Sequence, residues 1–264
     1  MRTIKLTLAY DGTAYAGWQS QTDQRTLQDT LEQALAQIVG ERLRVAASGR
    51  TDAGVHALGQ VVSFDTESSL SAEILHRALN AELPRDMAVI EVQDAPLGFH
   101  ARRDARSKRY RYVIRDVRRP NVFERNYSWQ VPQRLDNERL ARAAVSLVGT
   151  HDFSSFETHG SPRASSVRTV EALEIARDTA DPDRLLIEVE ANGFLYNMVR
   201  SIVGTLVEVG RCVRDEGWPA EVLAAADRRA AGRTAPAQGL FLLWVNYDRP
   251  LTDAAGGTES PREG

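Results

Sequence analysis

The sequence predicts an α+β protein made of two ferredoxin-like βαββαβ units whose sheets join side by side around a central cleft. Two observations predict this class. Strand patterns with a period of two and helix patterns with the helical period follow one another in the order βαββαβ over residues 1–100, and the same order returns over residues 101–250. Such a repeated order indicates an internal duplication. Residues 251–264, rich in Gly, Thr, Pro and charge, predict a disordered tail.

The first unit, an N-terminal domain over residues 1–100, begins with a strand at residues 4–10, because apolar and polar residues alternate until the Asp11-Gly12 turn signal. A helix follows. Thr26 stands at an N-cap position, and apolar residues recur at helical spacing until Gly40. The remaining elements predicted here are strands at residues 43–47 and 58–64, a helix capped by Ser71, and a strand at residues 87–92.

The second unit, a C-terminal domain over residues 101–250, shows the same alternation of patterns. Two segments, residues 118–132 and 219–227, do not fit the repeat and predict insertions, the second of them helical. Because ligands often bind in clefts between domains, the junction of the units is the expected site. The elements predicted in this unit are strands at residues 109–115, 167–175, 185–190 and 240–247, and helices at residues 136–148 and 195–209.

Composition restricts the class of protein. With 42% hydrophobic and 26% charged residues, the chain resembles an ordinary soluble globular protein. No apolar run approaches the roughly 20 residues that cross a membrane, and the chain starts on a strand pattern, which predicts a cytoplasmic protein. Cys212 is the one cysteine, so no intramolecular disulfide is expected. The five histidines lack paired metal-ligand spacing, so we expect no metal.

The net charge of −3 hides a local basic segment between residues 101 and 119. Strand alternation over residues 109–115 places Tyr110 and Tyr112 on one face and Arg109 and Arg111 on the other. We expect the basic face to hold phosphate and a tyrosine to stack on a base, although a solvated basic face with core tyrosines is also compatible. The cations of the segment are Arg102, Arg103, Arg106, Lys108, Arg109, Arg111, Arg115, Arg118 and Arg119.

A charged loop follows the predicted strand at residues 43–47. Asp52 lies two residues after Arg50, and the glycines Gly49 and Gly54 bound the tripeptide and favour tight turns. Beside Arg50, the carboxylate of Asp52 should stay ionised at neutral pH, so it could serve as a nucleophile or a base. A turn closed by a surface ion pair is the structural alternative.

Arg200 is the second candidate in the predicted helix at residues 195–209, where it falls just off the centre of a broad apolar face. A partly buried guanidinium group needs an anionic partner. We therefore expect Arg200 either to pair with an acidic side chain of the second unit or to reach the cleft near Asp52 or a phosphate.

Several motifs in order resemble those of the TruA family of tRNA pseudouridine synthases. The longest runs from Gly49 through the Arg50-Thr51-Asp52 tripeptide to Val62, and the resemblance covers most of the chain. The other segments are Tyr10-Asp11-Gly12 with Tyr15, Gly17-Trp18-Gln19, Phe99-His100-Ala101-Arg102, Lys108-Arg109-Tyr110-Arg111-Tyr112, Asn197-Met198-Val199-Arg200 and Gly239-Leu240.

The resemblance implies a role for five residues. Asp52 would be the catalytic aspartate, Tyr110 the base-stacking residue, Arg50 an RNA contact, Arg200 the ion-pair partner of the aspartate, and Leu240 part of the uracil pocket. It also implies isomerisation of uridine to pseudouridine without cofactor or metal, by a homodimer, at positions 38, 39 and 40 of the tRNA anticodon stem-loop. Whether Asp52 attacks the nucleotide or removes a sugar proton stays open.

Two other functions compete with this interpretation. The same fold could form an RNA-binding module without catalysis, in which the Asp52 carboxylate is dispensable. A glycoside hydrolase would need a second carboxylate about 5 to 9 Å from Asp52, for which Asp65 and Glu67 are the nearest candidates in sequence.

Overall fold

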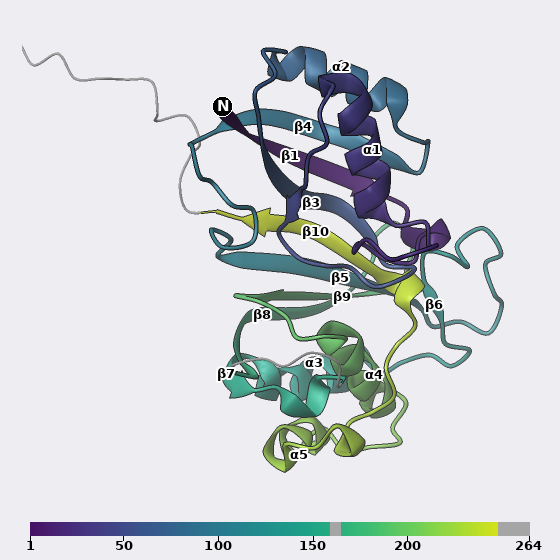
Figure 1. Cartoon of the computed structure of the whole chain (residues 1–264). Coiled ribbons are helices and arrows are strands. Elements are labelled where there is room, and N and C mark those ends of the chain that lie inside the picture. Colours follow the sequence, from purple (N-terminus) through teal and green to yellow (C-terminus); the bar gives the residue numbers. More distant parts are fainter. Residues whose placement is uncertain (159–164, 248–264) are drawn as a thin grey trace, which may run out of the picture.

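The computed structural model describes residues 1–158 and 165–247. One ten-stranded sheet runs through these residues, with five α-helices beside it (Figure 1). The predicted mixed α/β class is therefore confirmed. The strands on the main path of the sheet follow the order β4-β1-β3-β10-β5-β9-β8-β7. Their bounds are β1 Arg2–Tyr10, β3 His56–Thr66, β4 Met87–Ala95, β5 Ser107–Arg115, β7 Gly149–Asp152, β8 Val167–Arg177, β9 Arg184–Ala191 and β10 Leu240–Asn246.

The N-terminal part of the sheet is antiparallel. Strand β1 lies between β3 and β4, and the short strand β2 (Ala46–Ala47) pairs with β3 on its other side. The helices α1 (Leu27–Val39) and α2 (Ala72–Glu82) lie beside this part (Figure 1). The Thr26 side chain caps α1 by accepting a hydrogen bond from the Asp29 amide, as its position predicts.

The C-terminal part repeats this arrangement. Strand β5 lies antiparallel between β9 and β10, and β8 and β7 follow at the edge. Here the helices are α3 (Asn137–Ala144), α4 (Met198–Gly210) and α5 (Trp218–Ala225). Strand β10 joins the two parts, because it also pairs in parallel with β3, where Phe241 is opposite His56. The last strand of the chain therefore lies at the middle of the sheet.

Three predicted elements differ from the structure. The strand expected at residues 43–47 is only the two-residue β2. The helix expected at residues 195–209 begins at Met198, because Asn197 takes a left-handed conformation with φ of 62°. The helix expected at residues 136–148 ends at Ala144 and continues as a 3-10 turn. Within the expected insertion at residues 118–132, the short strand β6 (Trp129–Gln130) pairs with β5. The expected tail at residues 251–264 lies outside the described residues.

Candidate active site

The loop that carries Asp52 connects β2 to β3 and is held by the backbone around it. The Trp18 amide donates to the Thr51 carbonyl at 2.9 Å, and the Val55 amide donates to the Asp52 carbonyl at 3.1 Å. Gly17 permits this approach. It has a φ of 96°, and a Cβ on it would lie 2.9 Å from the Thr51 carbonyl oxygen. The Gly17-Trp18 motif therefore positions the Asp52 loop.

A buried polar network fixes the start of the same loop. The Tyr10 hydroxyl shares a hydrogen bond of 2.8 Å with the Thr51 hydroxyl. The Gln60 amide nitrogen donates to the Gly49 carbonyl at 2.9 Å, and the Ser48 hydroxyl donates to the Gln60 side-chain oxygen at 2.6 Å. Sequence reasoning assigned no role to Tyr10 or Gln60, although both stand within motifs. A satisfied buried network of this kind holds one loop conformation.

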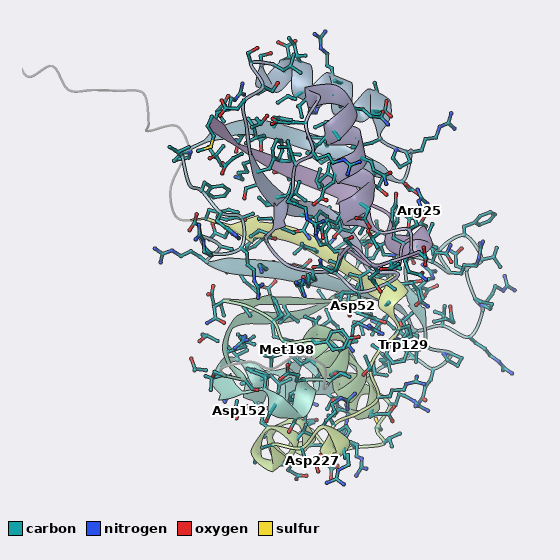
Figure 2. The ribbon with its side chains drawn as sticks, viewed as in Figure 1. Arg25, Asp52, Trp129, Asp152, Met198 and Asp227 are labelled. Carbon is teal, nitrogen blue, oxygen red and sulfur yellow. The ribbon has the colours of Figure 1, made fainter. Side chains whose placement is uncertain are left out.

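Asp52, which is labelled in Figure 2, forms an ion pair with Arg200. The pair joins the two parts of the chain. The Arg200 Nη1 lies 3.1 Å from the Asp52 Oδ2, and the two side chains are 17% and 26% exposed. Arg200 is itself held, because its Nε donates to the Ala235 carbonyl at 2.7 Å and its Nη1 donates to the Asn197 side-chain oxygen at 2.8 Å. The left-handed Asn197 thus orients the arginine toward the aspartate.

The expectation that Arg50 supplies the charge beside Asp52 is wrong. Arg50 is exposed and forms no ion pair within residues 1–158 and 165–247. The physical reason is that an exposed pair gains little, whereas the guanidinium of Arg200 is already fixed and partly desolvated. The partner is Arg200, 148 residues away in α4, the residue that the family resemblance implied.

Burial raises the pKa of the Asp52 carboxyl above its usual value, and the charge and hydrogen bond of Arg200 oppose this shift. A raised pKa makes the carboxylate a stronger base and nucleophile while Arg200 keeps its charge balanced. The carboxylate of Asp52 therefore has the electrostatic setting of a reactive group.

Tyr110 is buried on β5, and its ring meets the Phe194 ring edge-on at a centroid distance of 5.0 Å. Burial raises the pKa of its hydroxyl, and the electrostatic interactions with Tyr10 and then with Asp52 raise it further. Within the described residues this hydroxyl has no hydrogen-bond partner. By contrast, the Tyr112 hydroxyl donates to the Pro236 carbonyl at 2.7 Å, and Tyr112 belongs to the core, as one of the two interpretations expected.

Leu240 begins β10 and is buried opposite Tyr112. The glycine before it, Gly239, leaves room for the Tyr112 ring, because a Cβ there would lie 2.6 Å from the Tyr112 Cζ. Leu242, two residues further along β10, pairs with Tyr110. The first residues of β10 therefore lie beside the aromatic residues of β5.

The structure corrects the prediction that the basic face of β5 is free to hold phosphate. The Arg109 Nε lies 2.6 Å from a Glu188 carboxylate oxygen, and the Arg111 Nη2 lies 2.5 Å from the other. Arg115 likewise pairs with Asp181 and Glu124. Arg109 and Arg111 are neutralised because β9 places Glu190 and Glu188 opposite them, whereas the partners of Arg115 come from outside β9. Sequence reasoning missed this, since the register of β5 against β9 is not visible in a run of cations.

The carboxylates proposed for a glycoside hydrolase do not approach Asp52. Asp65 accepts a hydrogen bond from the Thr3 hydroxyl at 2.5 Å, and Glu67 binds the Met1 amine at 2.6 Å. Asp65 lies near the end of β3 and Glu67 just after it, about 30 Å from the loop at 3.3 Å per residue of strand. Among the described residues no cluster of three His, Cys, Asp or Glu side chains could hold a metal ion. Within that same part of the chain, no helix is long and apolar enough to span a membrane.

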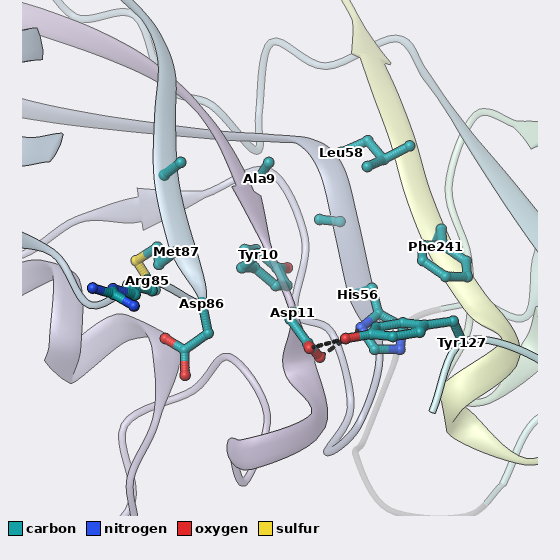
Figure 3. Close-up of a pocket in the computed structure, with 12 residues that line it drawn as sticks. Ala9, Tyr10, Asp11, His56, Leu58, Arg85, Asp86, Met87, Tyr127 and Phe241 are labelled. Atoms are coloured by element: carbon teal, nitrogen blue, oxygen red, sulfur yellow. Dashed lines mark hydrogen bonds and ion pairs between the residues drawn. The ribbon is translucent and has the colours of Figure 1, made fainter. Parts of the chain in front are cut away.

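A separate cavity of about 290 Å³ opens near the end of β1 (Figure 3). Its lining includes Asp11, His56 and Tyr127 but not Asp52. The Tyr127 hydroxyl donates to Asp11 at 2.6 Å, and the His56 Nε2 lies 2.9 Å from the Asn126 carbonyl oxygen, which ties the inserted segment to the N-terminal part. Burial lowers the pKa of His56, so the ring is neutral and acts as a structural hydrogen-bond partner.

The family model for tRNA pseudouridine synthase matches residues 7–104 and 143–248, which is more than half of the chain. The chain belongs to the tRNA pseudouridine synthase family. Proteins called tRNA pseudouridine synthase A are similar to it over nearly their whole length. That of Halalkalibacterium halodurans is 48% identical over 91% of this chain and 91% of the relative, and that of Acetivibrio thermocellus is 44% identical over 94% and 100%. A Geobacillus relative is 47% identical over 94% and 99%.

The family match bears on the site residues in different ways. The match includes the Asp52 loop, Arg200 and Leu240. Tyr110 lies outside it, because residues 105–142 are not matched. The geometry brings Asp52, Arg200 and Tyr110 together. Arg50 is exposed on the same loop as Asp52. Leu240 lies on β10, the strand next to the strand β5 that carries Tyr110.

Proposed function

We propose that this protein isomerises uridine to pseudouridine in tRNA, with Asp52 as the catalytic carboxylate. The observation that carries the proposal is the pair of Asp52 and Arg200, which lies where the two matched parts of the family model meet. In this reaction the bond from the sugar to the uracil nitrogen breaks, and a bond from the same sugar carbon to a ring carbon forms. The displaced ring proton leaves that carbon, and the nitrogen gains one.

The roles of the other residues follow from their places around Asp52. Tyr110 would stack on the uracil once it leaves its helix, and such stacking is worth about 1–3 kcal/mol, comparable to the cost of flipping the base. Leu240 would line the apolar side of the uracil pocket. Arg50, exposed on the same loop, is free to contact RNA. Arg200 would hold the carboxylate of Asp52 in one orientation during either first step, attack on the nucleotide or removal of a sugar proton.

The substrate region proposed is the tRNA anticodon stem-loop, at positions 38, 39 and 40, in the bacterial cytoplasm. Support comes from the names of the relatives, which are tRNA pseudouridine synthases. We also infer that the protein acts as a homodimer. Large apolar side chains remain exposed on β3, β4 and β10, and a second copy could cover them. They are Leu58, Ile90 and Trp244.

We further infer that residues 1–100 and 101–250 are two ferredoxin-like domains whose sheets join side by side. Strand orders support this, because β4-β1-β3-β2 and β10-β5-β9-β8 each reproduce the order of a βαββαβ unit. The catalytic loop would then lie at the junction of the domains.

Pseudouridine mapping tests the reaction and the target together. Purified protein is incubated with unmodified tRNA in the presence of a chelator, and the product is mapped. We expect pseudouridine at positions 38–40 and none in a tRNA that carries cytidine at those positions. Absence of pseudouridine despite tight binding of both tRNAs would favour the RNA-binding module instead.

A further inference from the structure

Lys108 stands apart from the other cations of β5. It and Lys5 are the two lysines of the sequence, in a chain whose other basic side chains, apart from histidine, are arginines. Lys108 lies two residues before Tyr110, so strand alternation puts the two side chains on the same face of the sheet. The pairing of β5 with β9 runs without a register shift through both residues, which preserves that alternation.

The ammonium group of Lys108 rests against the catalytic loop. Its Nζ donates to the Ser48 carbonyl at 2.5 Å. The Nζ also lies close to Gly49, because a Cβ on Gly49 would be 3.2 Å from it. Ser48 precedes Asp52 by only four residues of chain. The Lys108 charge therefore lies at the entry of the loop that presents the carboxylate.

This charge has no anionic partner in the part of the chain that the structure describes. The charged group that acts on it is Arg102, which has the same sign. On the flanking strands it stands opposite Val245 and Ala191, which are uncharged. Burial lowers the pKa of Lys108 to about 8. Its neighbours Arg109 and Arg111, by contrast, are matched by glutamates on the other face. A desolvated cation without a partner is costly and calls for a ligand.

We propose that the ammonium of Lys108 binds a backbone phosphate of the RNA, next to the uridine that Asp52 acts on. The proposal rests on the proposed function, since it takes its ligand to be the tRNA. An oxygen of the phosphate supplies the negative charge that the surrounding residues do not, and Gly49 leaves the loop backbone open beside it. Lys108 thereby fixes the register of the RNA strand relative to Asp52, as phosphate contacts do.

Two properties separate this role from a structural one. A phosphate contact adds to the salt dependence of binding, by about 0.7–0.9 in the slope of log affinity against log salt concentration. A bound phosphate also raises the pKa of the ammonium above its value in the free protein. Because the free ammonium loses its proton as pH rises through about 8, tRNA affinity should fall above that pH in the wild type.

The experiment uses two readouts. Binding of unmodified tRNA is measured across a salt series and across pH for wild type, Lys108→Met and Lys108→Arg, with Lys5→Met as the matched control. In parallel, ¹³C-labelled lysine gives two side-chain signals in wild type, assigned with Lys5→Arg, and the Lys108 signal is titrated with and without tRNA. We expect Lys108→Met to weaken binding several-fold and to lower the salt slope by about 0.7–0.9. Lys108→Arg should keep the slope and lose the affinity change near pH 8.

The NMR titration should show the pKa of Lys108 rising when tRNA binds, and it needs no variant that could fail to fold. An unchanged pKa together with an unchanged salt slope overturns the proposal, and a lower melting temperature alone would then mark Lys108 as structural. Pseudouridine formation is scored separately. If the wild type makes pseudouridine but neither the salt slope nor the pKa of Lys108 changes as expected, only the phosphate contact is overturned. If both change as expected but no pseudouridine forms, the catalytic function is overturned and the phosphate site remains.

Discussion

Both faces of β5 carry basic side chains, but these side chains meet different surroundings. On one face, Arg109 and Arg111 share Glu188 on the neighbouring strand. On the other face, Lys108 has only the Ser48 carbonyl, and the Tyr110 hydroxyl has no partner within the described residues. A run of cations in the sequence therefore does not by itself locate an RNA-binding surface. We propose that the groups the fold leaves unmatched bind the RNA, since Lys108 contacts the loop that carries Asp52.

The largest effect we expect comes from removing Arg200, the counter-charge of Asp52. Arg200→Met should lower the single-turnover rate about 10- to 100-fold, because a hydrogen bond to a charged group is worth about 1.5–3 kcal/mol. Without Arg200, burial alone acts on the Asp52 carboxyl, so the acid limb of the pH–rate profile should move to higher pH. Arg142→Met, which removes a surface pair with Glu216, serves as the control and should leave the profile in place. An unmoved acid limb in Arg200→Met would contradict the assigned pair.

A smaller effect should follow from changing the ring of Tyr110. Tyr110→Leu removes the stacking surface and should slow turnover about 5- to 100-fold, whereas Tyr110→Phe keeps the ring and should stay within a few-fold of wild type. Single-turnover kinetics at saturating protein separate this effect from binding. If Tyr110→Phe were as slow as Tyr110→Leu, the hydroxyl rather than the ring would be the functional group.

The face of β5 whose arginines pair with glutamates should contribute to stability and not to RNA binding. Arg109→Gln breaks pairs with Glu188 and Glu174 and should destabilise the fold by about 1 kcal/mol. The salt slope of tRNA binding should not change. Thermal unfolding and salt-dependent binding on the same preparation check both statements. A fall in the salt slope equal to that expected for Lys108→Met would show that both faces bind RNA.

The smallest effect concerns stability against pH. Because the pKa of Asp52 is raised in the folded protein, the folded state holds its proton more tightly than the unfolded state in the window just above the usual value of 3.8. Stability contributed by this group is therefore present below that window and is lost as pH rises through it. Denaturant unfolding from pH 3.5 to 6 should show wild type losing stability relative to Asp52→Asn. A difference independent of pH would contradict the raised pKa.

Much of this architecture could be predicted from local patterns. The cap at Thr26, the stop at Gly40 and the alternation of β5 each depend on residues close in sequence, and the structure has them as expected. The partner of Asp52 could not be derived in that way, since Arg200 comes from a helix 148 residues away and depends on Asn197 for its orientation. The pairing of Arg109 with Glu188 could not be predicted for a similar reason, because it depends on the register between β5 and β9.

We propose that the carboxylate of Asp52 does the chemistry while the rest of the site binds the RNA. The most direct measurement is single-turnover pseudouridine formation by Asp52→Asn, with tRNA affinity determined on the same sample and Asp94→Asn, an exposed partner of Arg2, as control. We predict that Asp52→Asn forms no detectable pseudouridine and binds tRNA within a few-fold of wild type, while Asp94→Asn is fully active. Turnover by Asp52→Asn at the wild-type rate would contradict the account.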